Sequence, residues 1–221
     1  MRYKKKNMLM LLMTVFIVGN AFAVPDFEVS AGVGAYFTSN FGGGYNYNYT
    51  SLDERSITKM PYAGGGVFAF FYLTFTELSL GIFTGYGDIT EDNPDWNFVR
   101  DNVYYTGIDI SLLGNYPFVI SNQFTVFPLI GINYQTMLLV LGSYEMYVRP
   151  FDSRWLWLKF GGGFDYSLSS KIFMRTAILY GFRIPNREEK KHVDWYNNEW
   201  TNTEIRPGHG LDIKLALGYR F

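Results

Sequence analysis

Residues 211–221 read LDIKLALGYRF, and this stretch alternates with a strict period of two. One set of alternate positions is large and apolar (Leu211, Ile213, Leu215, Leu217, Tyr219 and Phe221), and the other set is Asp212, Lys214, Ala216, Gly218 and Arg220. Successive side chains of a β-strand point to opposite faces of the sheet, so the stretch predicts a strand with one apolar face. The strand alone does not decide whether that face meets a soluble core or lipid.

The same alternation recurs along the chain and predicts eight strands. The other alternating stretches are 27–37, 77–83, 107–112, 126–133, 155–161 and 172–183. Residues 67–75, VFAFFYLTF, form one more expected strand. This strand is apolar on both faces, so alternation does not assign its orientation.

Three features favour an apolar face turned outward to lipid, as in a membrane barrel. The polar face is rich in glycine rather than in Lys and Glu, which suits a narrow interior. The expected strands are about 10–13 residues long, close to the ~9–11 residues that cross a bilayer at a tilt. Aromatic residues gather at strand ends, with Tyr62, Tyr86, Tyr104 and Tyr134 on one rim and Tyr116, Phe124, Tyr166 and Tyr219 on the other.

The connections between the expected strands alternate in length. Short ones lie at 74–77, 117–123 and 167–170, and long ones lie at 39–61, 87–102, 137–153 and 185–208. Short periplasmic turns and long extracellular loops are typical of outer-membrane barrels. The sequence therefore predicts an all-β fold, a closed eight-stranded antiparallel up-and-down transmembrane β-barrel with both termini in the periplasm.

The composition excludes several other classes of protein. Of the 221 residues, 19% are aromatic and 18% are charged, and there is no cysteine; this excludes disorder, a disulfide framework and thiolate chemistry. No apolar run reaches the length of about 18 residues that a membrane-spanning helix needs. The net charge of −1 lacks the excess of basic residues that is typical of nucleic-acid-binding proteins. We expect neither a cofactor nor a metal site.

The N-terminus has the pattern of a cleaved signal peptide. A basic segment, MRYKKKN, precedes a short apolar run from Met8 to Gly19, and Ala21 and Ala23 then form an A-x-A cleavage site. The apolar run is too short for a permanent anchor helix. We therefore expect residues 1–23 to be a signal peptide and residues 24–221 to form one exported barrel domain.

The end of the chain resembles the C-terminal assembly signal of outer-membrane proteins. Lys214, Tyr219 and Phe221 match its polar, hydrophobic and terminal aromatic positions, whereas Ala216 stands where glycine is usual. The mature chain as a whole is similar to the small eight-stranded outer-membrane barrels of the OmpX/OmpW type. The segments 110–118 (ISLLGNYPF), 124–135 (FTVFPLIGINYQ) and 156–166 (LWLKFGGGFDY) look similar to spirochaete, Treponema-like members.

This resemblance implies a location in the bacterial outer membrane and a set of partners. These are outer-membrane lipid, periplasmic chaperones and the barrel-assembly machinery, with Tyr219 and Phe221 as the residues that are read during assembly.

The polar face of the strands predicts an ionic layer inside the barrel. Its members are Asp109, Lys159, Asp165, Arg175, Arg183, Asp212 and Lys214. An eight-stranded barrel has an interior just wide enough for side chains, so the favoured interpretation is a salt-bridged plug. The alternative is a narrow path past the small residues Gly32, Gly34, Gly161 and Gly163, which would make the protein a passive channel for small or hydrophobic solutes, as the OmpW-like resemblance also implies.

The long loops are the variable part of such a barrel. Residues 40–56 and 186–210 are rich in Tyr, Trp and Asn, which suit a surface that contacts a host or surface ligand. The favoured alternative is that these loops brace one another or lie among lipid headgroups. We do not expect an enzyme, because His192 and His209 have no serine at short spacing and the pair Asp152 and Ser153 has no evident base. The function we predict is structural or surface interaction through the extracellular loops.

Overall fold

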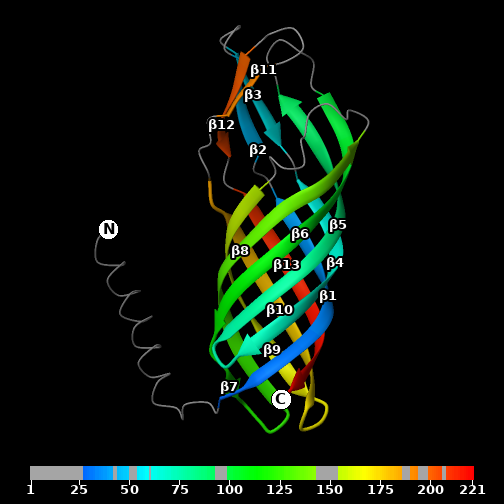
Figure 1. Ribbon diagram of the computed structural model, residues 1–221, viewed down its shortest axis with the longest axis vertical. Coiled ribbons are helices and arrows are strands. Elements are labelled where there is room, and N and C mark those ends of the chain that lie inside the picture. Colours follow the sequence, from blue (N-terminus) through cyan, green and yellow to red (C-terminus); the bar gives the residue numbers. More distant parts are fainter. Residues whose placement is uncertain are drawn as a thin grey trace, which may run out of the picture.

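The computed structural model describes residues 27–41, 44–49, 54–59, 61–92, 99–142, 154–185, 190–193, 199–205 and 208–221. Within them every regular element is a strand (Figure 1). The strands are β1 (Val29–Phe41), β2 (Gly44–Tyr49), β3 (Glu54–Lys59), β4 (Tyr62–Leu73), β5 (Thr76–Asp92), β6 (Val99–Asn115), β7 (Phe118–Val119), β8 (Phe124–Gly142), β9 (Arg154–Ser167), β10 (Ile172–Arg183), β11 (Lys190–Val193), β12 (Glu199–Ile205) and β13 (His209–Arg220). No helix among these residues is long and apolar enough to cross a membrane.

Eight of the strands close into a barrel. Neighbours pair antiparallel in the order β1, β4, β5, β6, β8, β9, β10 and β13, and β13 pairs with β1 to complete the ring. Each barrel strand therefore lies beside the barrel strands that precede and follow it in sequence, which is the up-and-down arrangement. The predicted closed eight-stranded antiparallel barrel is confirmed.

The apolar faces of the strands point outward. On β1, Val33 is 66% exposed, and on β13, Leu217 is 56% exposed. The residues on either side of each of them in sequence point into the barrel. The same arrangement settles the strand whose orientation the sequence left open. Phe68, Phe70 and Tyr72 of β4 are buried inside, and Val67 and Phe71 face outward. Closure is needed in lipid because an open edge would leave backbone groups without hydrogen-bond partners.

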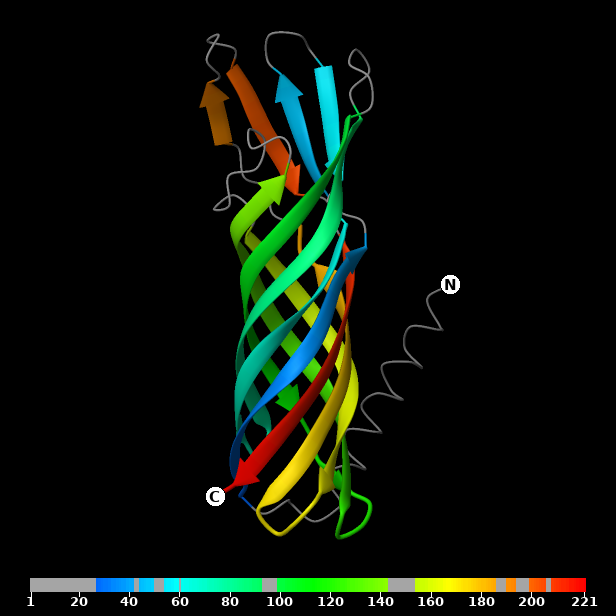
Figure 2. The same cartoon turned by 90° about the vertical axis from the view of Figure 1, so that its right-hand side faces the viewer.

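Three strands are longer than the sequence predicted. β5 and β6 have 17 residues each and β8 has 19, more than the ~9–11 that cross a bilayer at a tilt. Their upper parts rise beyond the other barrel strands on the side of the long loops (Figure 2). A bulge interrupts the pairing of β6 with β8 between Thr106 and Gly107, so that Leu138 and Leu139 both face outward.

Two of the expected loops contain strands. β2 and β3 form a hairpin in the first long connection, and β11 and β12 form one in the last. β12 pairs with β2, and β3 pairs with the top of β5. The backbones of the first and last loops are therefore joined to each other and to the barrel wall.

The opposite end of the barrel has short turns. β4 passes into β5 through Thr74, which has φ 41°, and through Phe75. The backbone N–H of Thr74 donates to the carbonyl of Glu28 at 2.9 Å, and the N–H of Glu28 donates to the hydroxyl of Thr74 at 3.0 Å. These bonds hold the tight turn against the residue that precedes β1.

Candidate functional site in the barrel interior

The strand alternation places all seven residues of the predicted ionic layer inside the barrel. Their exposed fractions lie between 1% and 5%, for Asp109, Lys159, Asp165, Arg175, Arg183, Asp212 and Lys214. Charged groups so far from water need partners. The structure groups these residues in separate places along the barrel, each with its own set of partners.

A middle cluster is centred on Lys159. Its ammonium contacts Asp212 directly and lies 3.8 Å from a carboxylate oxygen of Asp109. The hydroxyl of Thr38 donates to the other oxygen of Asp212 at 2.9 Å. One lysine therefore neutralises two acids from β6 and β13, and a residue of β1 completes the hydrogen bonding of one of them.

Asp109 also accepts from neutral side chains. Gln135 donates to one carboxylate oxygen at 3.0 Å and Ser111 donates to the other at 3.2 Å. The amide oxygen of Gln135 accepts from the hydroxyl of Tyr62 at 2.8 Å. Tyr62 is 4% exposed, so its predicted place on an outer aromatic rim is wrong; because it lies at an inward position of β4, its ring is part of the interior.

Lys214 lies beside this cluster with neutral contacts. Its ammonium donates to the hydroxyl of Ser79 at 3.1 Å and lies 5.1 Å from the ring centre of Phe68. The lysine extends from β13 to the inner face of β5, so the bond crosses the interior.

A second cluster surrounds Arg175 near the end of the barrel that carries the short turns. Its guanidinium forms two hydrogen bonds to Asp165, at 2.8 and 2.7 Å, and a third to Glu77 at 2.7 Å. Paired contacts of this kind are the strongest geometry available to a carboxylate and a guanidinium. The ring centres of Phe70, Tyr72, Phe127 and Phe173 lie 4.8 to 5.4 Å from the guanidinium carbon.

Glu77 is the member of this cluster that the sequence analysis left out. It lies both on the polar face of the predicted stretch 77–83 and at the end of the short connection 74–77, and it was not counted in the ionic layer. With Glu77 included, the buried charges among the described residues are four acids and four bases. Counting every charged residue on the polar face of the stretch 77–83 would have identified it.

A stack of rings fills the part of the interior that lies toward the long connections. The ring of Tyr62 is nearly parallel to the rings of Phe83 and Trp155, whose centres lie 5.9 and 5.6 Å from its own. The guanidinium carbon of Arg183 lies 5.3 Å from the ring of Trp155. Arg183 thus lies against this stack of rings.

The inward glycines lie beside aromatic rings from neighbouring strands. Gly32 pairs directly with Phe70, and a Cβ built on Gly32 would lie 2.5 Å from the ring. Gly163 pairs with Phe127, and the equivalent distance is 2.7 Å. The space that these glycines leave is therefore filled by rings, which does not favour the alternative of a narrow path along them. Gly34 lies against Ala216, and Gly161 against the backbone carbonyl of Ile178.

The remaining predicted residues lie outside this interior. Tyr219 and Phe221 of the assembly signal face outward, 41% and 79% exposed, whereas Lys214 faces inward. His209 is on the outer face, where its Nδ1 lies 2.6 Å from the hydroxyl of Tyr180. The cleavage site at Ala21 and Ala23, together with His192, Asp152 and Ser153, falls outside the residues whose side chains the structure describes.

No metal site accompanies these clusters in the described part of the chain, where no three His, Asp or Glu side chains are grouped to hold an ion. The arrangement offers paired charges, hydrogen bonds and ring contacts. Its chemistry is that of a packed polar interior.

Comparison with known proteins identifies the fold. No model of a known protein family matches the chain, and no curated protein sequence matches it. Among solved structures, the chain is similar to the outer membrane protein OprG from Pseudomonas aeruginosa, with a TM-score of 0.52 and 11% identity over 88% of this chain and 96% of that one. It is also similar to the outer membrane protease OmpT from Escherichia coli, with a TM-score of 0.52 and 10% identity over 89% and 99%. At these identities the likeness shows the fold alone, that of an outer-membrane barrel.

Proposed function

We propose that this chain is an exported outer-membrane barrel with a plugged interior and a structural or surface-interaction role carried by its extracellular loops. The observation that carries the proposal is the filling of the interior at three levels. Arg175 with its rings lies nearest the periplasm, the Lys159 cluster lies in the middle, and the Tyr62 stack lies toward the loops. Four buried acids balance four buried bases among the described residues, so the plug needs no mobile counter-ion.

The loop role is supported by the way the loops are held. Backbone pairing of β12 with β2, and of β3 with β5, fixes two loop hairpins to the barrel. A surface whose backbone is ordered before binding loses less conformational entropy when it meets a partner. We propose that this platform meets a host or surface ligand, and that lipid contacts and assembly by periplasmic chaperones and the insertion machinery follow from the outer-membrane location.

A role without catalysis suits the placement of His209. Its ring is on the outer face, bonded to Tyr180, and away from the carboxylates of the interior. The protease activity in the name of one similar structure belongs to that protein.

Single-channel recording tests the plug. The mature protein, residues 24–221, would be refolded and inserted in a planar bilayer, with a general porin of known conductance as the positive control and heat-shifted gel mobility as proof of folding. We expect a folded barrel that gives no current steps. Reproducible steps would overturn the plug and support the passive-channel alternative.

Cysteine labelling in intact cells tests location and orientation. The chain has no cysteine of its own, so Thr201→Cys and Asn202→Cys in β12 can be compared with Ser170→Cys in an exposed short turn. Neighbouring residues of a strand point to opposite sides, so at least one of the two β12 positions should react with a membrane-impermeant maleimide. Ser170→Cys should react only after the outer membrane is broken, and the reverse pattern would contradict the proposed orientation.

Mass measurement of the purified mature chain tests export. We expect the mass of a chain that begins at Val24. A chain that keeps residues 1–23 would remove the signal-peptide part of the proposal.

A further inference from the structure

The joint between β1 and β13 brings the two ends of the barrel domain together. Its inward positions are small where it passes through the periplasmic half, with Gly32 opposite Gly218 and Gly34 opposite Ala216. Nothing larger than a methyl group projects inward from these four positions. The interior beside this part of the joint must be filled by side chains from other strands.

Two rings from the flanking strands cover the joint. Phe70 of β4 lies over Gly32, and Phe173 of β10 lies over Gly218, so that an added Cβ on either glycine would collide with a ring. The rings meet each other at 6.3 Å between centres in an edge arrangement. They form a cover over the pair of glycines from its two sides.

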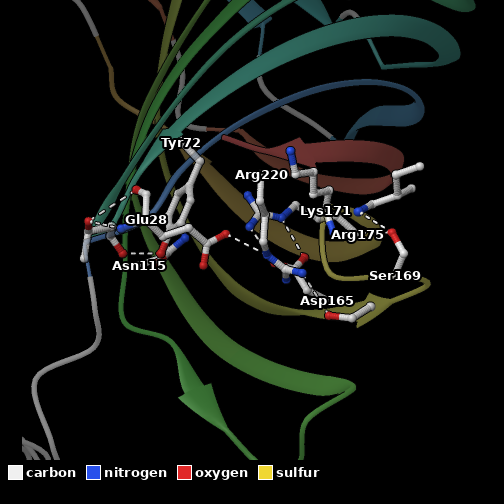
Figure 3. A network of polar contacts seen from close by, with 11 residues as sticks. Glu28, Tyr72, Asn115, Asp165, Ser169, Lys171, Arg175 and Arg220 are labelled. Carbon is white, nitrogen blue, oxygen red and sulfur yellow. Dashed lines mark hydrogen bonds and ion pairs between the residues drawn. The ribbon is translucent and has the colours of Figure 1, made fainter.

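An ion pair lies at the periplasmic end of the same joint (Figure 3). Nε of Arg220 donates to a carboxylate oxygen of Glu28 at 3.0 Å, and its Nη1 donates to the hydroxyl of Ser167 at 2.9 Å. The guanidinium carbon lies 4.5 Å from the ring centre of Phe173. Arg220, the last residue of β13, therefore contacts Glu28 just before β1, Ser167 at the end of β9 and the ring of Phe173 that covers Gly218.

Sequence separation distinguishes the Glu28–Arg220 ion pair from the Asp165–Arg175 pair of the interior. Asp165 and Arg175 are 10 residues apart on one hairpin, so their bonds can form as soon as β9 meets β10. Glu28 and Arg220 are 192 residues apart and come together only when the ring closes. The bond from Thr38 to Asp212, 174 residues apart, crosses the same joint farther along and fixes the same register.

We propose that Glu28 and Arg220 form a latch that holds the β1–β13 joint closed, with Phe70 and Phe173 packed over Gly32 and Gly218 once the two strands have met. The latch holds the register of the joint, because a slip by one residue would turn every side chain of a strand to the other face. It also resists reopening from the periplasmic end, where the terminal strands would otherwise fray first.

Two readouts during refolding into lipid vesicles test the latch. Far-ultraviolet circular dichroism follows strand formation, and the heat-shifted gel band follows closure of the barrel. Glu28→Gln and Arg220→Gln should leave the strand-forming phase unchanged and raise the rate of reopening of the closed form roughly fivefold, the effect of one partly exposed charged hydrogen bond. The double variant should reopen no faster than Arg220→Gln alone, because both changes remove one interaction.

Lys171→Gln is the matched control. It removes a cation in the turn before β10 that lies 5.7 Å from the ring centre of Tyr219, on the outer side of the same end. It should leave the rates of strand formation, closure and reopening unchanged. Closure and reopening at wild-type rates in both latch variants would overturn the proposal. So would equal slowing of strand formation and closure, because the pair would then act throughout folding rather than at the joint.

Discussion

Arg175 offers the sharpest test of how the interior is stabilised. Replacing Arg175 with Met removes a guanidinium that makes three hydrogen bonds to Asp165 and Glu77, and it leaves those two carboxylates buried without a cation. Breaking a buried ion pair by removing one partner costs about 3–5 kcal/mol. The lower bound already corresponds to more than about a hundredfold in the unfolding equilibrium.

The contacts with rings add to this cost. The four ring centres within 5.4 Å of the guanidinium carbon each contribute an attraction that is about 0.5–1 kcal/mol when exposed and larger when desolvated. Met keeps part of the packing and none of the charge. We therefore expect the loss in the free energy of unfolding to lie toward the upper end of the range.

A triple variant separates the charge from the packing. Arg175→Met combined with Asp165→Leu and Glu77→Met replaces the whole ionic cluster with apolar side chains, an exchange that is often neutral or stabilising. The triple variant should therefore be more stable than the single one. The assay is urea unfolding in lipid vesicles followed by tryptophan fluorescence, with the free energy extrapolated to zero urea. A single variant that loses less than about 1 kcal/mol, or a triple variant as unstable as the single, would refute this reasoning.

Three further changes probe other parts of the barrel. Deletion of Phe221, which is 79% exposed and ends the resembled assembly signal, should lower the yield of membrane-inserted protein in cells but not refolding in vitro, as cell fractionation would show; normal insertion would remove that role. Leu215→Arg places a charge on the lipid face, where Leu215 is 52% exposed, and should cost about 2–4 kcal/mol in vesicle unfolding experiments; a cost near zero would contradict an outward face in lipid. Gly218→Ala should slow closure of the barrel because its Cβ meets the ring of Phe173, and adding Phe173→Leu should restore part of the rate in the gel-shift assay; no recovery would mean that the backbone, and not the ring, rejects the methyl group.

The sequence predicted the wall of the barrel because the wall follows a local rule. Alternation with period two assigns each side chain to a face without knowledge of any partner strand, and Leu217 and Asp212 lie where that rule places them. The rule fails where both faces are apolar. For β4 the inward position of Phe68 and Phe70 depends on which glycines lie opposite, and that is a property of the register between strands rather than of one strand.

Element ends and individual partners were harder to predict for related reasons. Glu77 was left out of the ionic layer because it lies in both the stretch 77–83 and the expected connection 74–77, whereas the turn between β4 and β5 is only Thr74 and Phe75. Tyr62 was assigned to an outer rim because aromatic residues at strand ends are common at membrane interfaces, whereas the parity of β4 turns its side chain inward. The first long loop does alternate Tyr and Asn over residues 45–49, but this was interpreted as loop composition rather than as a strand. Its hairpin is paired to that of the last loop through β2 and β12.

The register between strands decides whether a glycine-rich polar face leaves an open path through the barrel or makes room for rings that fill it. A glycine-rich inner face would leave a path through a barrel if its small residues had small neighbours on both adjacent strands. Gly32 and Gly218 lie opposite each other, but each has a ring on its other side. Here Gly32 pairs with Phe70, Gly107 with Phe83, Gly163 with Phe127 and Gly218 with Phe173, each across one pair of strands. Every one of these rings lies so close to its glycine that an added Cβ would collide with it. Each of these four glycines thus forms one packing unit with its ring, and these glycines make room for rings rather than for a path.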